Sequence, residues 1–360
     1  MRSRFEHTVL YRDLTIEDTT FFKGIAILLI VLHNFFRKLP PYIGENEQYF
    51  DFNNLKRFTT IVINEPLYSF QAFFSFLGHY GVQVFLFLSA YGLTKKYLNS
   101  TLTYGHFLQT RFKKIYPVFI LAVLFWAFYV GLKYGGPVQV IYDHWESLWM
   151  KLLLISNFVP GELYTINGPW WFLSLIFQFY ILFPLLLKIE NQYGSYILLI
   201  LSFLSLLLSY LLQPYLDIRL GGTVFMHLPE LTLGIIFAKR GEVKMPILLF
   251  GALVIIFILS NYYQLFWYFS YISVVLILLL IIQGIYSCSC GFFKSIVMLC
   301  GSLSMYIFFI NGFLRNPWIG FAEYFTNWYM NIFFCMIFVS VVLISSVLMK
   351  KIHQLVLNRN

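Results

Sequence analysis

Long, nearly unbroken runs of apolar residues alternate with short polar stretches along most of the 360-residue chain. A helix needs about 20 apolar residues to cross the hydrocarbon core of a bilayer, whereas a membrane barrel would show short alternating segments. The runs therefore predict an all-α, polytopic membrane bundle with about ten transmembrane helices. We expect these helices at residues 21–38, 70–97, 114–133, 169–189, 195–213, 222–239, 245–261, 265–285, 296–314 and 329–349.

The segments outside these runs set the expected domain organisation. Residues 1–20 are polar and are expected to form a cytoplasmic N-terminal segment, residues 21–349 a single transmembrane domain, and residues 350–360 a cytoplasmic tail. The first apolar run follows a polar start and has no small-residue cleavage site, so we expect a permanent anchor rather than a signal peptide. Segment 145–160 is apolar but short and contains Lys151, which favours an interfacial or re-entrant position.

Composition supports the membrane class. The chain is 59% hydrophobic and 11% charged, against about a quarter charged residues in soluble domains. This excludes a soluble enzyme, a disordered chain and a disulfide-stapled secreted domain. Four cysteines are present, and the spacing of Cys288 and Cys290 fits no common zinc or redox motif. We therefore expect the cysteines to act as small apolar residues and the protein to have no metal site.

The charge distribution predicts the orientation. If the N-terminus is cytoplasmic and the helices alternate, the inner segments carry 17 of the 25 Lys and Arg residues. This bias favours both termini on the cytoplasmic side of the cytoplasmic (inner) membrane. It also explains the net charge of +9 without a nucleic-acid partner. The longest outer loops, 39–69 and 134–168, are expected to help shape an outward-facing acceptor site.

The first apolar run contains a candidate catalytic histidine. His33 follows Lys23, which is expected at the cytoplasmic edge, by ten residues. Ten helical residues span about 15 Å, which is half of a hydrocarbon core of about 30 Å. An ionisable side chain at that depth is costly and suggests function, and a neutral imidazole can act as a general base. The alternative is a structural histidine that bonds to a neighbouring helix.

A basic cluster precedes the third predicted helix. Arg111, Lys113 and Lys114 lie just inside the expected cytoplasmic edge. They could anchor the helix through the positive-inside bias and contact anionic lipid. They could also bind phosphate groups, because guanidinium suits bidentate contacts with phosphate.

Other polar residues fall inside or at the ends of predicted helices. Gln83 lies near an outer helix end, Trp171 fits an outer aromatic belt, and Gln178 lies well inside its helix and needs a hydrogen-bond partner. Glu230 lies a third to half-way into its predicted helix and must be paired or protonated there. His33 or an arginine would be a natural partner, and both a functional role and a structural ion pair stay open.

Five sequence blocks in order resemble the acyltransferase type 3 family, bacterial membrane enzymes that O-acetylate surface sugars. The blocks are a basic residue, Gly-Ile-Ala, an apolar run and His (23–33); GV-x-VF-x-x-x-S (81–89); R-x-basic-basic-I-x-P (111–117); W-F-L-S…Q-F-Y (171–180); and L-P-E…G (228–234). The family's ten-helix core also agrees with the predicted helix count.

The chain departs from the family pattern at four places. The first basic residue is usually Arg, eleven positions before the His, whereas Lys23 stands ten before it. Gln83 replaces a frequent Asp, Ile176 a frequent Glu, and Asn311 follows Tyr306 where the family often has His.

The resemblance implies transfer of an acetyl or other short acyl group from acyl-CoA to a hydroxyl of a cell-surface glycan or glycolipid. Acetyl-CoA would be a co-substrate, with no permanently bound cofactor. A transporter or flippase for a glycolipid or small polar substrate is the alternative, because such proteins also have about ten helices and intramembrane polar residues. Any second step is expected to need a partner enzyme, and a homo-oligomer is a further expected assembly.

The resemblance also suggests roles for the candidate residues. His33 would take the proton of the acceptor hydroxyl, Asn34 or a backbone amide would stabilise the oxyanion, and Glu230 would orient His33 or bind acceptor hydroxyls. The residues expected to bind the phosphates of coenzyme A are Lys23, Arg111, Lys113 and Lys114. Those expected to bind substrate are Gln83, Trp171 and Gln178.

Overall fold

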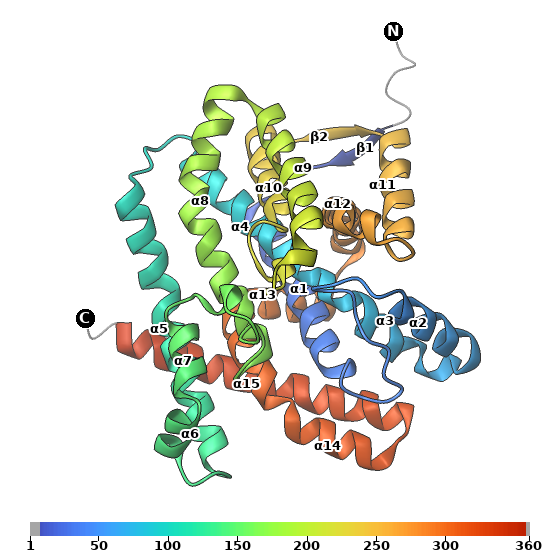
Figure 1. The fold of residues 1–360 in the computed structure, drawn as a ribbon, viewed down its shortest axis with the longest axis vertical. Helices are drawn as coiled ribbons and strands as arrows, with labels where there is room; N and C mark the ends of the chain where they lie inside the picture. The colour runs from blue at the N-terminus through green and yellow to red at the C-terminus, as the bar shows by residue number, and fades with distance from the viewer. Residues whose placement is uncertain (1–7, 358–360) are drawn as a thin grey trace.

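The computed structural model describes residues 8–357 and is built almost entirely of helices (Figure 1). Within the described residues, eight helical segments are long and apolar enough to cross a membrane. They are Ile16–Phe36 (α1), Pro66–Tyr97 (η1, α3, η2 and α4), Tyr104–Gly131 (α5), Gly168–Tyr193 (η4 and α8), Ser195–Tyr215 (α9 and η5), Gln264–Cys288 (α12), Gly291–Leu314 (α13) and Trp328–Val356 (in α15). The predicted all-α, polytopic membrane bundle is therefore confirmed.

Several of these segments combine more than one helix. Their parts are η1 (Pro66–Tyr68), α3 (Ser69–Leu77), η2 (Gly78–Tyr80), α4 (Gly81–Tyr97), η4 (Gly168–Trp170), α8 (Trp171–Tyr193), α9 (Ser195–Leu212) and η5 (Gln213–Tyr215). The last segment lies within the single helix α15 (Trp328–Leu357).

Two predicted spans, 222–239 and 245–261, are shorter in the structure. They correspond to α10 (Leu228–Arg240) and α11 (Ile247–Ser260), of 13 and 14 residues. At 1.5 Å per residue each measures about 20 Å, less than a hydrocarbon core of about 30 Å. Val224 and Met226, ahead of α10, lie buried in a turn instead, and the helix begins only at Leu228, with Pro229 in its first turn, where proline is favoured.

The other elements are short and connect the long helices. They are α2 (Phe52–Asn64), α6 (Pro137–Asp143), α7 (Trp145–Leu152), α14 (Asn316–Phe325), η3 (Ser156–Phe158), η6 (Leu220–Gly222), β1 (Thr8–Tyr11) and β2 (Val243–Pro246). The two strands pair antiparallel and join the N-terminal segment to the connection between α10 and α11, which the sequence analysis did not predict. Segment 145–160 forms α7 and η3, with Lys151 buried.

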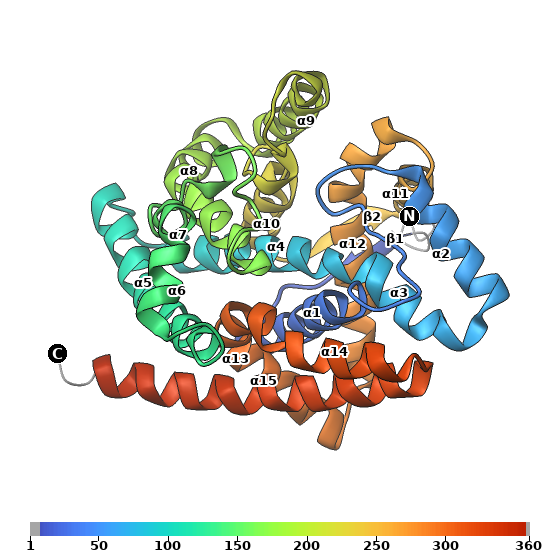
Figure 2. The same ribbon diagram turned by 60° about the horizontal axis from the view of Figure 1, so that its bottom comes forward.

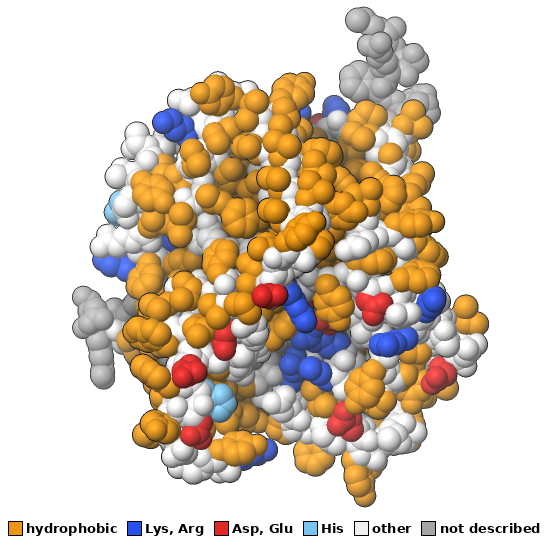
Figure 3. Space-filling view, viewed as in Figure 1, with side chains coloured by type: hydrophobic (Ala, Val, Ile, Leu, Met, Phe, Trp, Pro, Cys, Tyr) orange, Lys and Arg blue, Asp and Glu red, His pale blue; other side chains and the backbone are white. Residues whose placement is uncertain are grey.

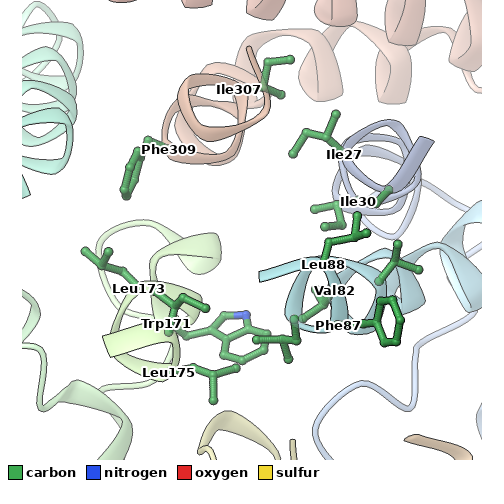
Figure 4. Packing of buried hydrophobic residues seen from close by; sticks show 14 of the residues in the cluster. Ile27, Ile30, Val82, Phe87, Leu88, Trp171, Leu173, Leu175, Ile307 and Phe309 are labelled. Carbon is green, nitrogen blue, oxygen red and sulfur yellow. The ribbon is translucent and has the colours of Figure 1, made fainter. Parts of the chain in front are cut away.

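Helix α1 occupies the centre of the bundle. It begins at Ile16, five residues before the predicted start, because Thr15 and Asp18 form a capping box. Figure 2 shows α1 beside α13, with α4 on one side and α15 on the other. Its buried side chains face those of three other helices around one interior (Figure 4). The labelled residues are Ile27 and Ile30 of α1, Val82, Phe87 and Leu88 of α4, Trp171, Leu173 and Leu175 of α8, and Ile307 and Phe309 of α13.

Two glycines allow α1 and α13 to approach closely. A Cβ atom at Gly24 would overlap the carbonyl oxygen of Val297, and one at Gly301 would overlap that of Thr20. Small residues of this kind let helix backbones approach within membrane bundles. The close contact fixes the position of α1, and hence of His33, relative to α13.

We expect Gly24→Ala to lower the free energy of unfolding by about 1–3 kcal/mol, the usual cost of overpacking a well-packed contact. The matched control is Gly284→Ala in α12, where nothing lies within 4 Å of the added Cβ. Thermal unfolding of the purified protein in detergent compares the two. Equal melting temperatures for both variants would contradict the close packing of α1 on α13.

Candidate active site

His33 lies in the last turn of α1, and its side chain is 2% exposed. Its Nδ1 lies 3.0 Å from the carbonyl oxygen of Ser75 and 3.3 Å from that of Phe74, both in α3. A carbonyl accepts hydrogen bonds and cannot donate them, so in the neutral imidazole this contact assigns the proton to Nδ1. The other nitrogen, Nε2, is then unprotonated in the neutral ring and lies 3.3 Å from Oε2 of Glu45, which can accept a hydrogen bond from Nε2 once the ring takes up a second proton.

A largely buried ion pair lies next to His33. Arg37 follows α1 one turn after His33, and its Nη1 lies 2.5 Å from Oε1 of Glu45 and 3.9 Å from Oε2 of Glu47. Burial alone would raise the pKa of Glu45, but the facing Arg37 guanidinium holds this pKa well below its usual range. Burial, together with the Glu45 charge, raises the pKa of Glu47 to about 8. The two opposite shifts favour the negative charge on Glu45, the carboxyl group closer to Arg37.

His33, Glu45 and Glu47 also offer ligand atoms that lie within 4.8 Å of one another, a spacing that suits a metal ion. Histidine nitrogen and carboxylate oxygen are common zinc ligands. In this structure, however, Arg37 already faces both carboxyl groups and supplies a positive charge. The group is therefore electrically balanced as it stands.

A narrow pocket surrounds His33. Its lining comes from α1 and the loop that follows it, η2, α4, the loop before η4, η4 itself, α8 and α13. The polar and aromatic lining residues are His33, Asn34, Arg37, Glu47, His79, Tyr164, Trp171 and Phe308. The ring centroid of His79 lies 5.4 Å from that of His33, and neither of its ring nitrogens has a hydrogen-bond partner.

On one side of this pocket lies a larger cavity of about 410 Å³, here called the α5 cavity. Lys23, Arg111 and Lys114 line it together with serine and tyrosine hydroxyls. The rest of its lining is apolar and includes Phe172 and Phe308. Because Phe308 also lines the His33 pocket, the α5 cavity and that pocket adjoin.

On the other side lies a polar cavity of about 390 Å³, here called the Arg315 cavity. Arg37, Lys38 and Arg315 supply three cationic side chains to its lining, and His144, Asn167 and Asn316 are among the other polar residues. Arg37, Tyr164 and Gly168 line both this cavity and the His33 pocket. Along α1 the order is therefore the α5 cavity at Lys23, the pocket at His33 and the Arg315 cavity at Arg37.

Comparison with known proteins identifies the family. A family model described as an acyltransferase domain matches residues 18–350, nearly the whole chain. The chain belongs to the acyltransferase type 3 family. No curated protein and no solved structure matches it. Membership makes this protein a membrane acyltransferase, and it favours that activity over the transporter or flippase alternative.

Glu230 pairs with His227, and not with His33 or an arginine, the two partners that the sequence suggested. Oε1 of Glu230 lies 3.0 Å from Nδ1 of His227, and the other nitrogen of His227 lies 2.9 Å from the carbonyl oxygen of Gly221. The indole of Trp171 stacks on the His227 ring with centroids 6.0 Å apart. Glu230 therefore belongs to a second buried cluster, and Trp171 contacts both this cluster and the His33 pocket.

Three other predicted site residues, Asn34, Gln178 and Gln83, lie in different surroundings. Asn34 lines the His33 pocket, and its side-chain amide donates to Oδ1 of Asn311 at 3.0 Å. Gln178 accepts a hydrogen bond from the backbone of Val224 at 3.0 Å, which gives it the partner it needed. Gln83 is buried, and its Oε1 has no partner.

The structure separates Lys113 from the other predicted phosphate-binding residues. Its side chain is exposed and does not line the α5 cavity, whereas Arg111 and Lys114 do. On a helix, positions 111 and 114 share a face and position 113 points elsewhere. This periodicity could have separated them from the sequence alone.

Sequence reasoning missed the residues that surround His33. Arg37 lies four positions after His33 and so shares its helix face, which was a usable signal. Glu45 and Glu47 lie in the loop 39–69, which was expected to shape an acceptor site without any residue being singled out. His79 and Arg315 carried no local signal, because only the fold brings η2 and the end of α13 to this place.

Proposed function

We propose that this acyltransferase moves an acetyl or other short acyl group from acyl-CoA, bound at the cytoplasmic face, to a hydroxyl of a cell-surface glycan or glycolipid. The observation that carries the proposal is the position of His33 between two cavities, each with cationic side chains. One cavity can take the donor and the other the acceptor, so that the two meet at His33.

The α5 cavity suits the donor. Coenzyme A carries several phosphate charges, which cannot enter hydrocarbon cheaply and need cationic partners. Lys23, Arg111 and Lys114 provide such partners at one end of the cavity. The uncharged pantetheine arm would lie along the apolar lining towards Phe308 and bring the thioester to the His33 pocket.

The geometry of His33 suits a general base. With its Nδ1 proton directed at the carbonyl oxygen of Ser75, Nε2 can accept the proton of the acceptor hydroxyl as that oxygen attacks the thioester carbonyl. The new C–O bond forms, the C–S bond breaks, and the proton passes from Nε2 to the departing thiolate. The Glu45 carboxylate beside Nε2 would stabilise the imidazolium that forms in between.

The charge bias of the sequence supports the assignment of faces. The α5 cavity lies at segments 1–23 and 95–114, which are rich in Lys and Arg and are expected to be cytoplasmic. The Arg315 cavity lies at the opposite end of α1, beside loops 39–69 and 134–168, which are expected to be outside. An acceptor on the cell surface would then enter through the Arg315 cavity.

Binding of coenzyme A to purified protein in nanodiscs tests the proposal. We expect Arg111→Ala to weaken binding about tenfold, since a hydrogen bond to a charged group is worth about 1.5–3 kcal/mol. Lys113→Ala is the matched control, because Lys113 is a neighbouring cation outside the cavity, and its affinity should stay within about twofold. Wild-type protein that neither binds coenzyme A nor hydrolyses acetyl-CoA would overturn the proposal.

A further inference from the structure

The cationic side chains of the Arg315 cavity differ in how they are neutralised. Arg37 faces Glu45 and Glu47, so its charge is matched within the protein. Within residues 8–357, no carboxylate lies within 4.0 Å of a side-chain nitrogen of Lys38 or Arg315. The cavity therefore has cationic side chains in excess of its acidic ones. Figure 3, drawn from the same side as Figure 1, shows Lys and Arg side chains gathered near the middle of this face.

Arg315 is the more unusual of the two. Its side chain is 7% exposed, its Nη1 donates to the carbonyl oxygen of Asn34 at 2.9 Å, and its buried Nε has no partner. Burial, and then repulsion from Arg37, lower the pKa of Arg315 to about 9. A buried cation without a counter-charge is costly for the fold. An anion in the cavity would offset that cost and satisfy the free donors.

We propose that the acyl acceptor is acidic, with a carboxylate or phosphate on its sugar that Arg315 and Lys38 bind in the Arg315 cavity. The inference rests on the proposed function, because it takes this cavity as the acceptor site. A guanidinium binds either anion through two parallel hydrogen bonds, which also fixes the orientation of the sugar. Arg37, Tyr164 and Gly168 line both the cavity and the His33 pocket, so a sugar held in this way can direct a hydroxyl to Nε2.

An anionic lipid headgroup would offer the same chemistry. A sugar acceptor is favoured because the unpaired donors line a cavity that adjoins the His33 pocket and contains the amide side chains of Asn167 and Asn316. Asparagine amides suit the hydroxyl groups of a sugar, since they both donate and accept hydrogen bonds. The lipid alternative is tested below.

The test compares methyl glucuronide, methyl glucoside and methyl glucoside 6-phosphate as probes of purified protein in phosphatidylcholine nanodiscs. Equilibrium binding is measured for each, together with the rate of coenzyme A release from acetyl-CoA. We expect wild type to bind both acidic probes at least tenfold more tightly than the neutral one. Arg315→Gln should reduce this preference to within about twofold, and Arg315→Lys should retain part of it.

Two further variants distinguish the loss of a positive charge in the cavity from the loss of a positive charge elsewhere on the surface. Lys38→Ala, at an exposed position that tolerates change, should reduce the preference without affecting folding. Lys133→Ala removes an exposed lysine just after α5 that does not line the cavity, and it should behave as wild type. Equal binding of acidic and neutral probes by wild type, including no binding of any, overturns the proposal. So does a preference that Arg315→Gln and Lys38→Ala leave unchanged.

Nanodiscs with phosphatidylglycerol distinguish the lipid alternative. If this lipid abolishes the binding of acidic probes to wild type but not to Arg315→Gln, the cavity is a headgroup site and the proposal fails. Coenzyme A binding in the same samples separates this inference from the proposed function. Normal coenzyme A binding without acidic preference refutes only the acceptor class, whereas acidic preference without coenzyme A binding refutes the donor assignment.

Discussion

Replacing His33 with alanine should reduce acyl transfer by about 10²–10⁴-fold, the usual contribution of a positioned general base. The variant removes Nε2, the atom proposed to take the proton from the acceptor hydroxyl. Binding of coenzyme A should remain within about twofold of wild type, because Lys23, Arg111 and Lys114 lie in the adjoining α5 cavity. Acetyl-CoA hydrolysis and coenzyme A affinity, measured on the same nanodisc samples, check both parts.

His106→Ala is the control for the loss of a histidine. His106 lies in α5 with an exposed side chain, and its removal should leave both measurements unchanged. His33→Asn adds a second test, because an amide can keep a hydrogen bond to the Ser75 carbonyl but cannot serve as a base near neutral pH. If either His33 variant transferred acyl groups at the wild-type rate, His33 would be a structural residue.

The fold was largely predictable because the period and length of apolar runs determine which segments can cross a bilayer. Each of the ten predicted runs holds a helix, and eight helical segments have the required length and hydropathy. Hydrophobicity alone does not report where a helix begins. Val224 and Met226, ahead of Leu228, are apolar and buried, yet they lie in a turn. Helix α1 starts at a polar capping box, which a hydropathy argument does not consider.

The candidate site was predictable only in part. His33, Lys23 and Arg111 were found because each is a charged or ionisable group at a position where such groups are costly or clustered. Their arrangement around adjoining cavities was not, since no local pattern relates segments so far apart in the chain. Glu230 shows the opposite error: its partner His227 lies only three residues before it on the chain, so a local signal was present, whereas the expected partner His33 lies in another helix.

Removing the Arg37 side chain tests what holds the site together. Arg37→Leu should lower the free energy of unfolding by about 3 kcal/mol, because it removes the guanidinium that neutralises the Glu45 carboxylate, and His33 can replace that charge only by taking up a proton. This is the lower end of the usual cost of breaking a buried ion pair, since the Glu45 side chain is 17% exposed. The variant should also be nearly inactive, as an unpaired Glu45 would then bind to protonated His33 and remove its free lone pair.

The double variant Arg37→Leu with Glu45→Gln decides whether the charge pair causes these losses. It removes both charges, so it should recover at least half of the lost stability, which a double-mutant cycle of melting curves would measure. Arg12→Leu is the control, because it breaks the Arg12–Asp18 pair near the start of α1, where the arginine is 35% exposed and the cost should be below about 1 kcal/mol. A double variant as unstable as Arg37→Leu would mean that Arg37 acts through packing. The charge of Arg37 would then not be what keeps Glu45 ionised beside His33. Glu45 could still stabilise the imidazolium, but it would do so without help from Arg37.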